Sequence, residues 1–144
     1  MGVAAASIAL SQPQLNEKQT AKEDIIELPT DFLFDFDNAN IRPGAISTLE
    51  KAATILRQQN VSHARIEGHS DSKGQPDYNL HLSQQRAEAV KNWLVDRGGL
   101  GNVTFTLRGF GATQPAAPDT NRDGSDNPEG RARNRRVVIA FDKQ

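Results

Sequence analysis

The sequence predicts an α+β domain in which helices cover one face of a β-sheet. Two observations support this fold class: short segments with strand-like patterns alternate with long helical ones, and the 144 residues are 36% hydrophobic and 24% charged. A single domain typically has ~100–200 residues, and a chain of this length can bury a core without disulfides or metals. Alternating strands and helices pack well as a sheet with a helical layer on one face.

Four segments have the patterns of β-strands. Residues 32–36 are short and aromatic and follow Pro29. Residues 64–68 and 103–108 alternate between apolar and polar side chains, which is typical of a half-buried strand. Residues 137–141 form a continuous, β-branched, apolar run, as expected for an inner strand.

Two segments, residues 43–59 and 76–97, have the pattern of helices. Their apolar residues recur every three or four positions, as on one face of a helix. These residues are Ile46, Leu49, Ala53 and Leu56 in the first segment, and Leu80, Ala87, Val90 and Leu94 in the second. Pro43 suits the first turn of a helix, and Gly98 followed by Gly99 predicts where the second helix ends.

The remaining segments are predicted to be an arm and a loop. Residues 1–24 are small and polar and are predicted to be a flexible arm, a linker or a remnant of a signal or anchor segment. The apolar run at residues 3–10 is too short to span a membrane, which takes ~20 residues. Residues 25–144 are predicted to form the folded domain. Within it, residues 110–135 are rich in Pro, Asp, Asn and Gly, which predicts a long loop.

Composition argues against several classes of site. The chain has no Cys, which excludes disulfide frameworks, Cys-based zinc sites and thiol catalysis. Its formal net charge of -1 gives no general attraction to nucleic acid or anionic membranes. His63, His69 and His81 do not have the spacing of metal ligands on one face. We therefore expect neither a metal nor a cofactor.

Asp71 and Arg86 are the first candidates for a binding site. Asp71 follows a predicted strand, where binding loops tend to lie. Asn79, Ser83 and Arg86 are spaced to share one face of the next helix. An acid and a guanidinium in one pocket would suit a zwitterion, since the carboxylate accepts from an ammonium and the guanidinium binds a carboxylate through two hydrogen bonds. The alternative is that Asp71 and Arg86 form an ion pair with each other.

A family resemblance is carried by several motifs that occur in order. They are Gly68-His69-Ser70-Asp71, the run from Tyr78-Asn79 through Leu82-Ser83 to Arg86-Ala87, Gly109-Phe110-Gly111, Pro115 and Asn134-Arg135-Arg136-Val137. Together with Phe34-Asp35-Phe36-Asp37, they resemble the OmpA-like peptidoglycan-binding domain. That domain is the C-terminal domain of outer-membrane protein A, the peptidoglycan-associated lipoprotein and the flagellar stator protein MotB. The resemblance covers about Phe32 to Phe141, and ordered blocks are more specific than any single motif.

This resemblance implies a fold, a ligand and a location. The fold is a mixed four-stranded sheet with helices on one face, in the order βαβαββ. The ligand is the diaminopimelate residue in the peptide stem of peptidoglycan. The binding residues by family correspondence are Ser70, Asp71, Asn79, Leu82, Ser83, Arg86, Asn134, Arg135 and Arg136; Ser70 stands where the family commonly has Thr. The implied role is to tether a component of the Gram-negative envelope to the wall from the periplasm, with membrane attachment only through a segment outside this chain. Copies of the chain could also assemble into a homo-oligomer.

The loop that begins at Asp119 has two interpretations. Asp119, Asn121, Asp123 and Gly124 match the opening of a calcium-binding loop, D-x-N-x-D-G. However, the twelfth position is Gly130 rather than the required Glu. A solvated polar turn is the favoured interpretation, and a calcium-modulated wall-binding module is the alternative.

A cluster of arginines near the end of the chain could bind nucleic acid. Its members are Arg131, Arg133, Arg135 and Arg136. Because only 6% of the residues are aromatic and the net charge is not positive, a groove that follows phosphates is poorly supported. We expect no nucleic-acid partner, and we expect these arginines to line a pocket edge and to pair with nearby Asp residues.

An enzyme acting on peptidoglycan, such as a hydrolase of the peptide stem or glycan, is the alternative to a binding module. An enzyme needs an acid, base or nucleophile with a perturbed pKa in a cleft. The sequence has no convincing pair of carboxylates, and His69-Ser70-Asp71 lies outside any G-x-S-x-G nucleophile motif. We therefore expect a binding module without catalytic residues.

Overall fold

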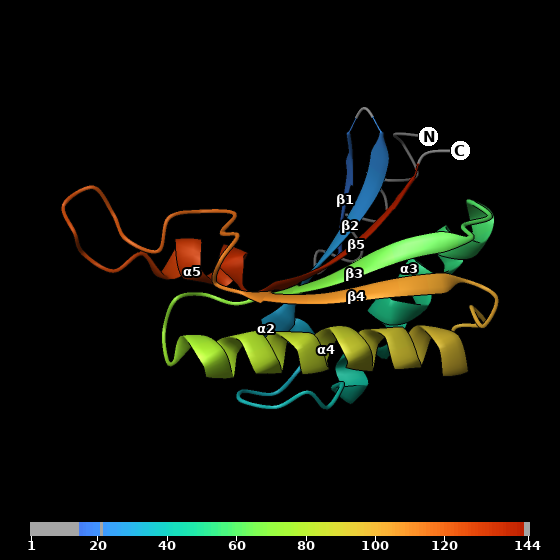
Figure 1. The fold of residues 1–144 in the computed structure, drawn as a ribbon, viewed down its shortest axis with the longest axis horizontal. Helices are drawn as coiled ribbons and strands as arrows, with labels where there is room; N and C mark the ends of the chain where they lie inside the picture. Colours follow the sequence, from blue (N-terminus) through green and yellow to red (C-terminus); the bar gives the residue numbers. More distant parts are fainter. Residues whose placement is uncertain (1–14, 21, 143–144) are drawn as a thin grey trace.

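The computed structural model describes residues 15–20 and 22–142, which form a five-stranded sheet (Figure 1). The spatial order of the strands is β1-β2-β5-β3-β4. All neighbouring strands are antiparallel except β3 and β4, which are parallel. The strands are β1 (Asn16–Gln19), β2 (Glu23–Pro29), β3 (His63–His69), β4 (Thr104–Gly111) and β5 (Arg136–Asp142).

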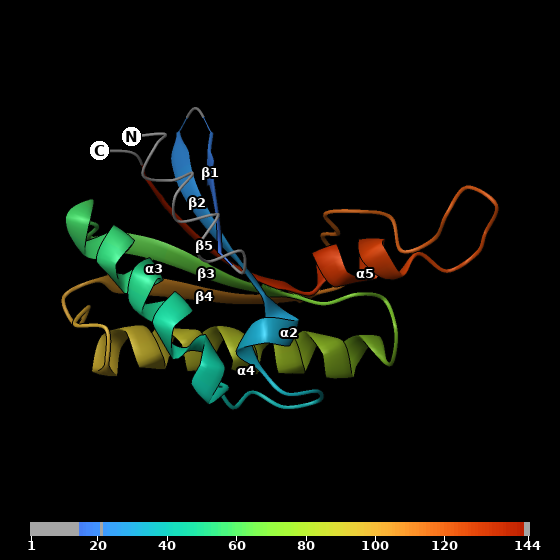
Figure 2. The same cartoon turned by 180° about the vertical axis from the view of Figure 1, so that it is seen from behind.

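Helices α3 and α4 lie on one face of this sheet, as both views show (Figures 1 and 2). The helical segments are α2 (Thr30–Leu33), the 3₁₀ turn η1 (Pro43–Ala45), α3 (Ile46–Gln58), α4 (Pro76–Asp96) and α5 (Pro128–Asn134). The short α5 lies near one end of the sheet, and the loop before it extends away from the body of the domain. Within the described residues, no helix is both long and apolar enough to cross a bilayer.

The predicted sheet with helices on one face is confirmed, but it has five strands rather than four. The strand predicted at residues 32–36 is wrong: Phe32 and Leu33 lie in α2, and Phe34 forms only an isolated bridge with Ile41. These residues are apolar because Leu33 and Phe34 are buried in the core, not because they alternate along a strand.

β1 and the first two residues of β2 lie where the sequence predicted a flexible arm, and the rest of β2 lies in the predicted domain but was not predicted to be a strand. Asn16–Gln19 forms β1 and pairs with β2, whose first residues are Glu23 and Asp24. All four residues of β1 are exposed, so they give no apolar pattern that would predict a strand. Their stability comes from the backbone ladder with β2. Residues 1–14 of the predicted arm lie outside the described residues.

The other predicted segments agree with the structure, with one exception. The strands at 64–68, 103–108 and 137–141 and the helices at 43–59 and 76–97 are confirmed. The predicted loop at 110–135 is wrong for its last part, which forms α5. This helix begins at Pro128, and the Asn127 side chain caps it by accepting a hydrogen bond from the Gly130 N–H.

The core lies between the sheet and the helices. Fully buried side chains come from α2, α3, α4, β3 and β5: Leu33, Leu49, Leu56, Ile66, Val90, Leu94, Val137 and Ile139. Burial of a Leu, Ile or Val side chain contributes about 1.5–3 kcal/mol, so this layer supplies most of the force that holds the helices on the sheet.

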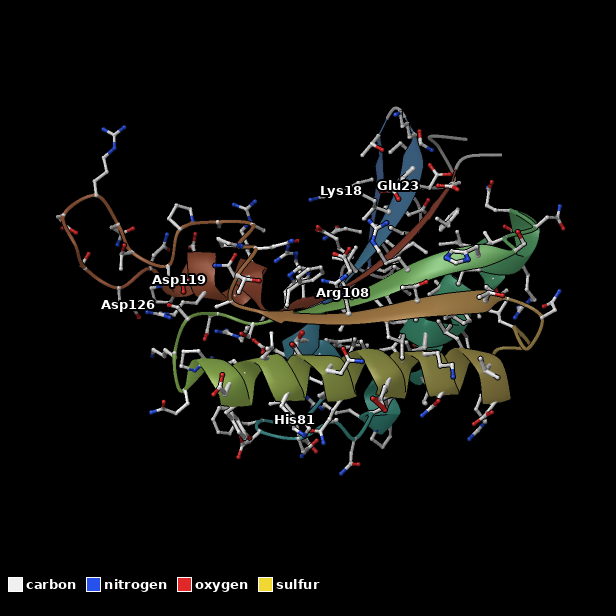
Figure 3. All side chains as sticks on the ribbon, in the orientation of Figure 1. Lys18, Glu23, His81, Arg108, Asp119 and Asp126 are labelled. Atoms are coloured by element: carbon white, nitrogen blue, oxygen red, sulfur yellow. The ribbon has the colours of Figure 1, made fainter. Side chains whose placement is uncertain are left out.

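The sheet face away from α4 carries a chain of ion pairs. Arg65 binds Glu23 at 2.9 Å and Glu67 at 2.5 Å, and the His69 Nε2 lies 3.0 Å from the Glu67 carboxylate. The hydrogen bond with His69, helped by Arg65, lowers the pKa of Glu67. Figure 3 shows Glu23 and Arg108 on this side. The charges of Glu23, Arg65 and Glu67 therefore compensate one another within this face.

Two glycines set the distance between α4 and the sheet. Gly68 of β3 and Gly109 of β4 are paired, and both face the α4 backbone. A Cβ on Gly109 would lie 2.5 Å from the Gln84 N, and a Cβ on Gly68 would overlap the Ser83 carbonyl. Glycine is thus required at both positions by the close approach of the helix.

We predict that Gly68→Ala destabilises the domain by about 3 kcal/mol or more, because the methyl group meets backbone that has no space to move. Urea unfolding followed by circular dichroism measures this change. Gly44→Ala is the matched control, since a Cβ there meets nothing within 4 Å. Equal stability of the two variants would show that α4 does not depend on this close contact.

Candidate functional site

A cavity with a volume of about 910 Å³ lies at the end of the sheet beside the first half of α4. Its walls come from the loop after β3, from α4, from the segment between α2 and Arg42, and from the residue before β5. It brings together seven of the nine predicted binding residues: Ser70, Asp71, Asn79, Leu82, Ser83, Arg86 and Arg135.

Asp71 is buried at the base of the loop between β3 and α4, with 8% of its surface exposed. Its Oδ2 accepts a hydrogen bond from the Arg135 Nη1 at 2.6 Å, and its Oδ1 accepts from the Lys73 N–H at 3.0 Å. A carboxylate can accept about four hydrogen bonds, so Asp71 retains capacity for a ligand donor.

Arg86 extends from α4 into the same cavity and is about half buried. Its Nε donates to the Asn38 carbonyl at 2.9 Å, and its guanidinium lies 5.3 Å from the centre of the Phe34 ring. Within the described part of the chain, no carboxylate lies within ion-pair distance of this guanidinium. Desolvation by burial lowers the pKa of Arg86. The arginine therefore presents a partly desolvated positive charge without an acidic partner.

The alternative that Asp71 and Arg86 pair with each other is wrong, because Asp71 pairs with Arg135. Arg135 also holds Asp31: its Nε donates to Oδ1 at 3.0 Å and its Nη2 donates to Oδ2 at 3.0 Å. Burial lowers the pKa of Arg135, but the hydrogen bonds that Arg135 donates to Asp31 and Asp71 outweigh it, so the pKa is raised.

Asp31 is a pocket residue that the sequence did not reveal. It is 104 residues away from Arg135 along the chain, and it lies just before the segment predicted to be a strand. No local spacing relates the two. Only the pairing of β2 with β5, in which Pro29 lies opposite Arg136, brings them together.

The remaining polar residues of the pocket support its shape. The Ser70 hydroxyl donates to the Asp71 carbonyl, and the Asn79 side chain donates to the Lys73 carbonyl at 2.7 Å. The buried Ser83 hydroxyl accepts from the Gly111 N–H at 3.0 Å and therefore joins α4 to β4. Leu82 is half buried and adds apolar surface to the wall.

Asn134 and Arg136 do not line this pocket, in contrast to the expectation from the family motif. Asn134 is buried and accepts hydrogen bonds from the N–H groups of Ala116 and Ala117 at 2.7 and 2.9 Å. Arg136 donates to the Gln114 carbonyl, and its Nε lies 3.8 Å from Glu27. Both residues fix the loop after β4, because their polar groups point to the backbone of that loop.

The outer rim of the pocket is formed by the loop that follows α2. The Tyr78 hydroxyl of α4 donates a hydrogen bond to Asp37 in this loop, which raises the pKa of Tyr78. The Asp35 carbonyl also accepts from Arg86. Phe36 is 95% exposed at the rim. Two side chains of α4 thus hold the rim loop over the pocket.

Comparison with known proteins identifies the family. The profile of the OmpA family matches residues 33–135, which include β3, α4, β4 and α5. The chain belongs to the OmpA family. The resemblance inferred from the sequence motifs is therefore confirmed.

Relatives of this OmpA-family chain include proteins of different size. It is 31% identical over 138 residues to the outer-membrane lipoprotein YfiB of Pseudomonas aeruginosa, covering 96% of this chain and 77% of that protein. It is 39% identical over 112 residues to a Gloeobacter violaceus protein named Photosystem I P700 chlorophyll a apoprotein A2, covering 78% of this chain but 13% of that protein. Because the match covers so small a part of that protein, it does not indicate a photosynthetic role for this chain.

The fold is also found in solved structures. The cell wall anchor of the T6SS from Pseudomonas aeruginosa superposes with a TM-score of 0.81 at 27% identity, covering 99% of this chain and 96% of that chain. The periplasmic domain of Helicobacter pylori MotB superposes with a TM-score of 0.77 at 24% identity, covering 95% and 84%. At this lower identity the second likeness supports the fold alone.

The loop with the calcium-like motif lies outside the pocket of this OmpA-family domain; Figure 3 marks Asp119 and Asp126 in it. Asp119 accepts hydrogen bonds from the Ser72 N–H at 2.8 Å, the Ser72 hydroxyl, and the Asn134 side chain at 2.5 Å, and it pairs with Arg131 at 3.3 Å. Asp123 accepts from the N–H and hydroxyl of Ser125. Asp119 therefore joins this loop to the residue that follows Asp71.

We predict that millimolar Ca²⁺, or a chelator, leaves the melting temperature unchanged, because the Asp119 oxygens already accept from protein donors. Differential scanning calorimetry with and without Ca²⁺ measures this. A rise of the melting temperature that follows the Ca²⁺ concentration would instead support the calcium interpretation.

Proposed function

We propose that this chain binds the diaminopimelate residue of the peptidoglycan stem without catalysis and so tethers an envelope component to the wall. The observation that carries the proposal is a half-buried guanidinium, Arg86, without an acidic partner, in the same pocket as a buried carboxylate, Asp71. The free end of diaminopimelate has an ammonium and a carboxylate on one carbon, which is complementary to this pair of charges.

Arg86 is proposed to bind the carboxylate of that end. A guanidinium presents donors in a planar fork that matches the two oxygens of a carboxylate. Its Nε already donates to Asn38, and the rim loop and Phe34 hold the side chain in place. Because the guanidinium is ordered and partly desolvated before the ligand arrives, little entropy is lost when the ligand binds.

Asp71 is proposed to accept from the ammonium. Its position is fixed by Arg135 and by the Lys73 N–H, and the Ser70 N–H in turn donates to the Gly111 carbonyl. The carboxylate is therefore a rigid acceptor. A charge-assisted hydrogen bond contributes ~1.5–3 kcal/mol.

The relatives support a role at the wall. The matches include proteins named cell wall anchor of the T6SS and, at 39% identity over 84 residues, peptidoglycan-associated lipoprotein of Rhizobium meliloti. The chain spans 47% of that lipoprotein and 32% of outer membrane porin F of Pseudomonas aeruginosa. We therefore propose a location in the periplasm of a Gram-negative envelope, where this domain is one part of an anchoring protein.

A pocket that holds its ligand through two charge-assisted contacts is expected to bind weakly at a single site. Two charge-assisted contacts are partly offset by the entropy lost on association, so the dissociation constant is expected to be roughly micromolar to millimolar. The wall repeats the same peptide stem many times. Several copies of the domain near one wall would therefore hold it more firmly than a single contact does.

We predict that Asp71→Ala and Arg86→Ala each reduce co-sedimentation with diaminopimelate-type sacculi at least tenfold, because each leaves one charge of the ligand unpaired in the pocket. The matched control is Arg122→Ala, which removes an exposed charge from the loop outside the pocket. Circular dichroism confirms that the variants are folded. Retained binding by both pocket variants would overturn the assignment, and release of soluble muropeptides by the parent would indicate a hydrolase.

We predict weaker binding to sacculi whose stems carry lysine in place of diaminopimelate. Lysine keeps the terminal ammonium but lacks the neighbouring carboxylate, so Arg86 would gain no partner. Pull-down of both kinds of sacculi in one experiment measures the preference. Equal recovery from the two walls would contradict a role for Arg86 in binding a carboxylate.

A further inference from the structure

We infer that Asp31 is a specificity-determining residue of the pocket: it shares Arg135 with Asp71, so that the two acids and one arginine keep a net negative charge for a ligand ammonium. This inference rests on the proposed function. Neither the sequence motifs nor the family correspondence pointed to Asp31. It follows from the contacts of Arg135, which lies between two carboxylates in the wall of the pocket.

The division of Arg135 between these two acids is uneven. Towards Asp31 it presents Nε and Nη2, in a two-pronged arrangement with three N–O distances of 3.0–3.1 Å. Towards Asp71 it presents Nη1 alone, at 2.6 Å. A two-pronged contact with a carboxylate fixes the plane of a guanidinium. Asp31 therefore binds two of the Arg135 nitrogens and leaves one, Nη1, to donate to Asp71.

The charges around Arg135 do not cancel. Asp31 and Asp71 together carry two negative charges, and Arg135 supplies one positive charge. Among the described residues, the other hydrogen bond to the Asp71 carboxylate comes from the neutral Lys73 N–H, and Arg131 acts on Asp71 only coulombically. The charges of Asp31, Asp71 and Arg135 thus sum to one negative charge. Arg86, which has no ion-pair partner among the described residues, supplies a positive charge in the same pocket, and Asp31 also acts on it coulombically. The net negative charge of this cluster and the positive charge of Arg86 are complementary to the ammonium and the carboxylate of a zwitterion.

Loss of Asp31 would remove this match. Arg135 would then neutralise Asp71 alone, and a ligand ammonium would meet an acid whose charge is already compensated. A ligand with carboxylates but no ammonium would meet less repulsion than before. The predicted effect is therefore opposite in sign for the two kinds of ligand. A general change in pocket shape would weaken both.

The test compares meso-diaminopimelate with pimelate, which has the same carbon chain and both carboxylates but no ammonium. Dissociation constants are measured by NMR titration at low ionic strength, because salt screens exposed charges. Asp31→Asn is expected to weaken meso-diaminopimelate binding about three- to tenfold, a modest change because the Asp31 side chain is 60% exposed. Pimelate binding is expected to stay the same or to tighten.

Two further variants complete the experiment. Asp31→Glu retains the charge and is expected to restore the preference for the ammonium ligand. Asp77→Asn, which removes an exposed charge from the first turn of α4 outside the pocket, is expected to leave the preference unchanged. Equal weakening of both ligands by Asp31→Asn, or no change in either, would overturn the inference. Failure of the parent to bind meso-diaminopimelate at all would instead overturn the proposed function.

Discussion

The close contact between α4 and the sheet at Gly68 and Gly109 is the constraint on which the pocket depends. The helix backbone at Ser83 and Gln84 lies so near the paired glycines that no side chain fits between them. Arg86 is one turn further along the helix, and Asp71 is three residues beyond Gly68. The distance between the acid and the guanidinium is therefore set by backbone packing, which is more rigid than a contact between flexible side chains.

The second level of organisation is the set of hydrogen bonds around the loop that carries Asp71. Ser70 is held by Gly111, Ser72 by Asp119, and Lys73 by both Asp71 and Asn79. Asn134 and Arg131 then connect Asp119 to α5. Asn134, which the family motif suggests as a ligand contact, thus supports the loop that carries Asp71 through its hydrogen bond to Asp119. Substitution of such a residue would alter ligand binding indirectly, because it would move Asp71.

Local patterns in the sequence predicted the parts of the fold and site that depend on neighbouring residues. The apolar periods of α3, α4, β3 and β4 could be recognised in the sequence because they reflect burial on one face, except at Leu80, which is 44% exposed. The spacing of Asp71 and Arg86 allowed them to share one pocket because they lie on adjacent elements, but it equally allowed an ion pair between them, and only the family resemblance suggested a binding role. β1 was missed because all its side chains are exposed, and α5 was missed because its capping residues, Asn127 and Pro128, are also typical of loops.

Contacts between distant segments could not be predicted in this way. Arg135 pairs with Asp31 only because β2 and β5 are neighbours, so Asp31 after β2 and Arg135 before β5 meet at one end of their ladder. A ligand held there depends on both strands staying paired. Since only the folded chain would offer the proposed site, occupancy would stabilise the whole domain, by about 1.4 kcal/mol for each tenfold excess of ligand over its dissociation constant. Binding to the wall would therefore stabilise the folded state of this domain as well as attach it.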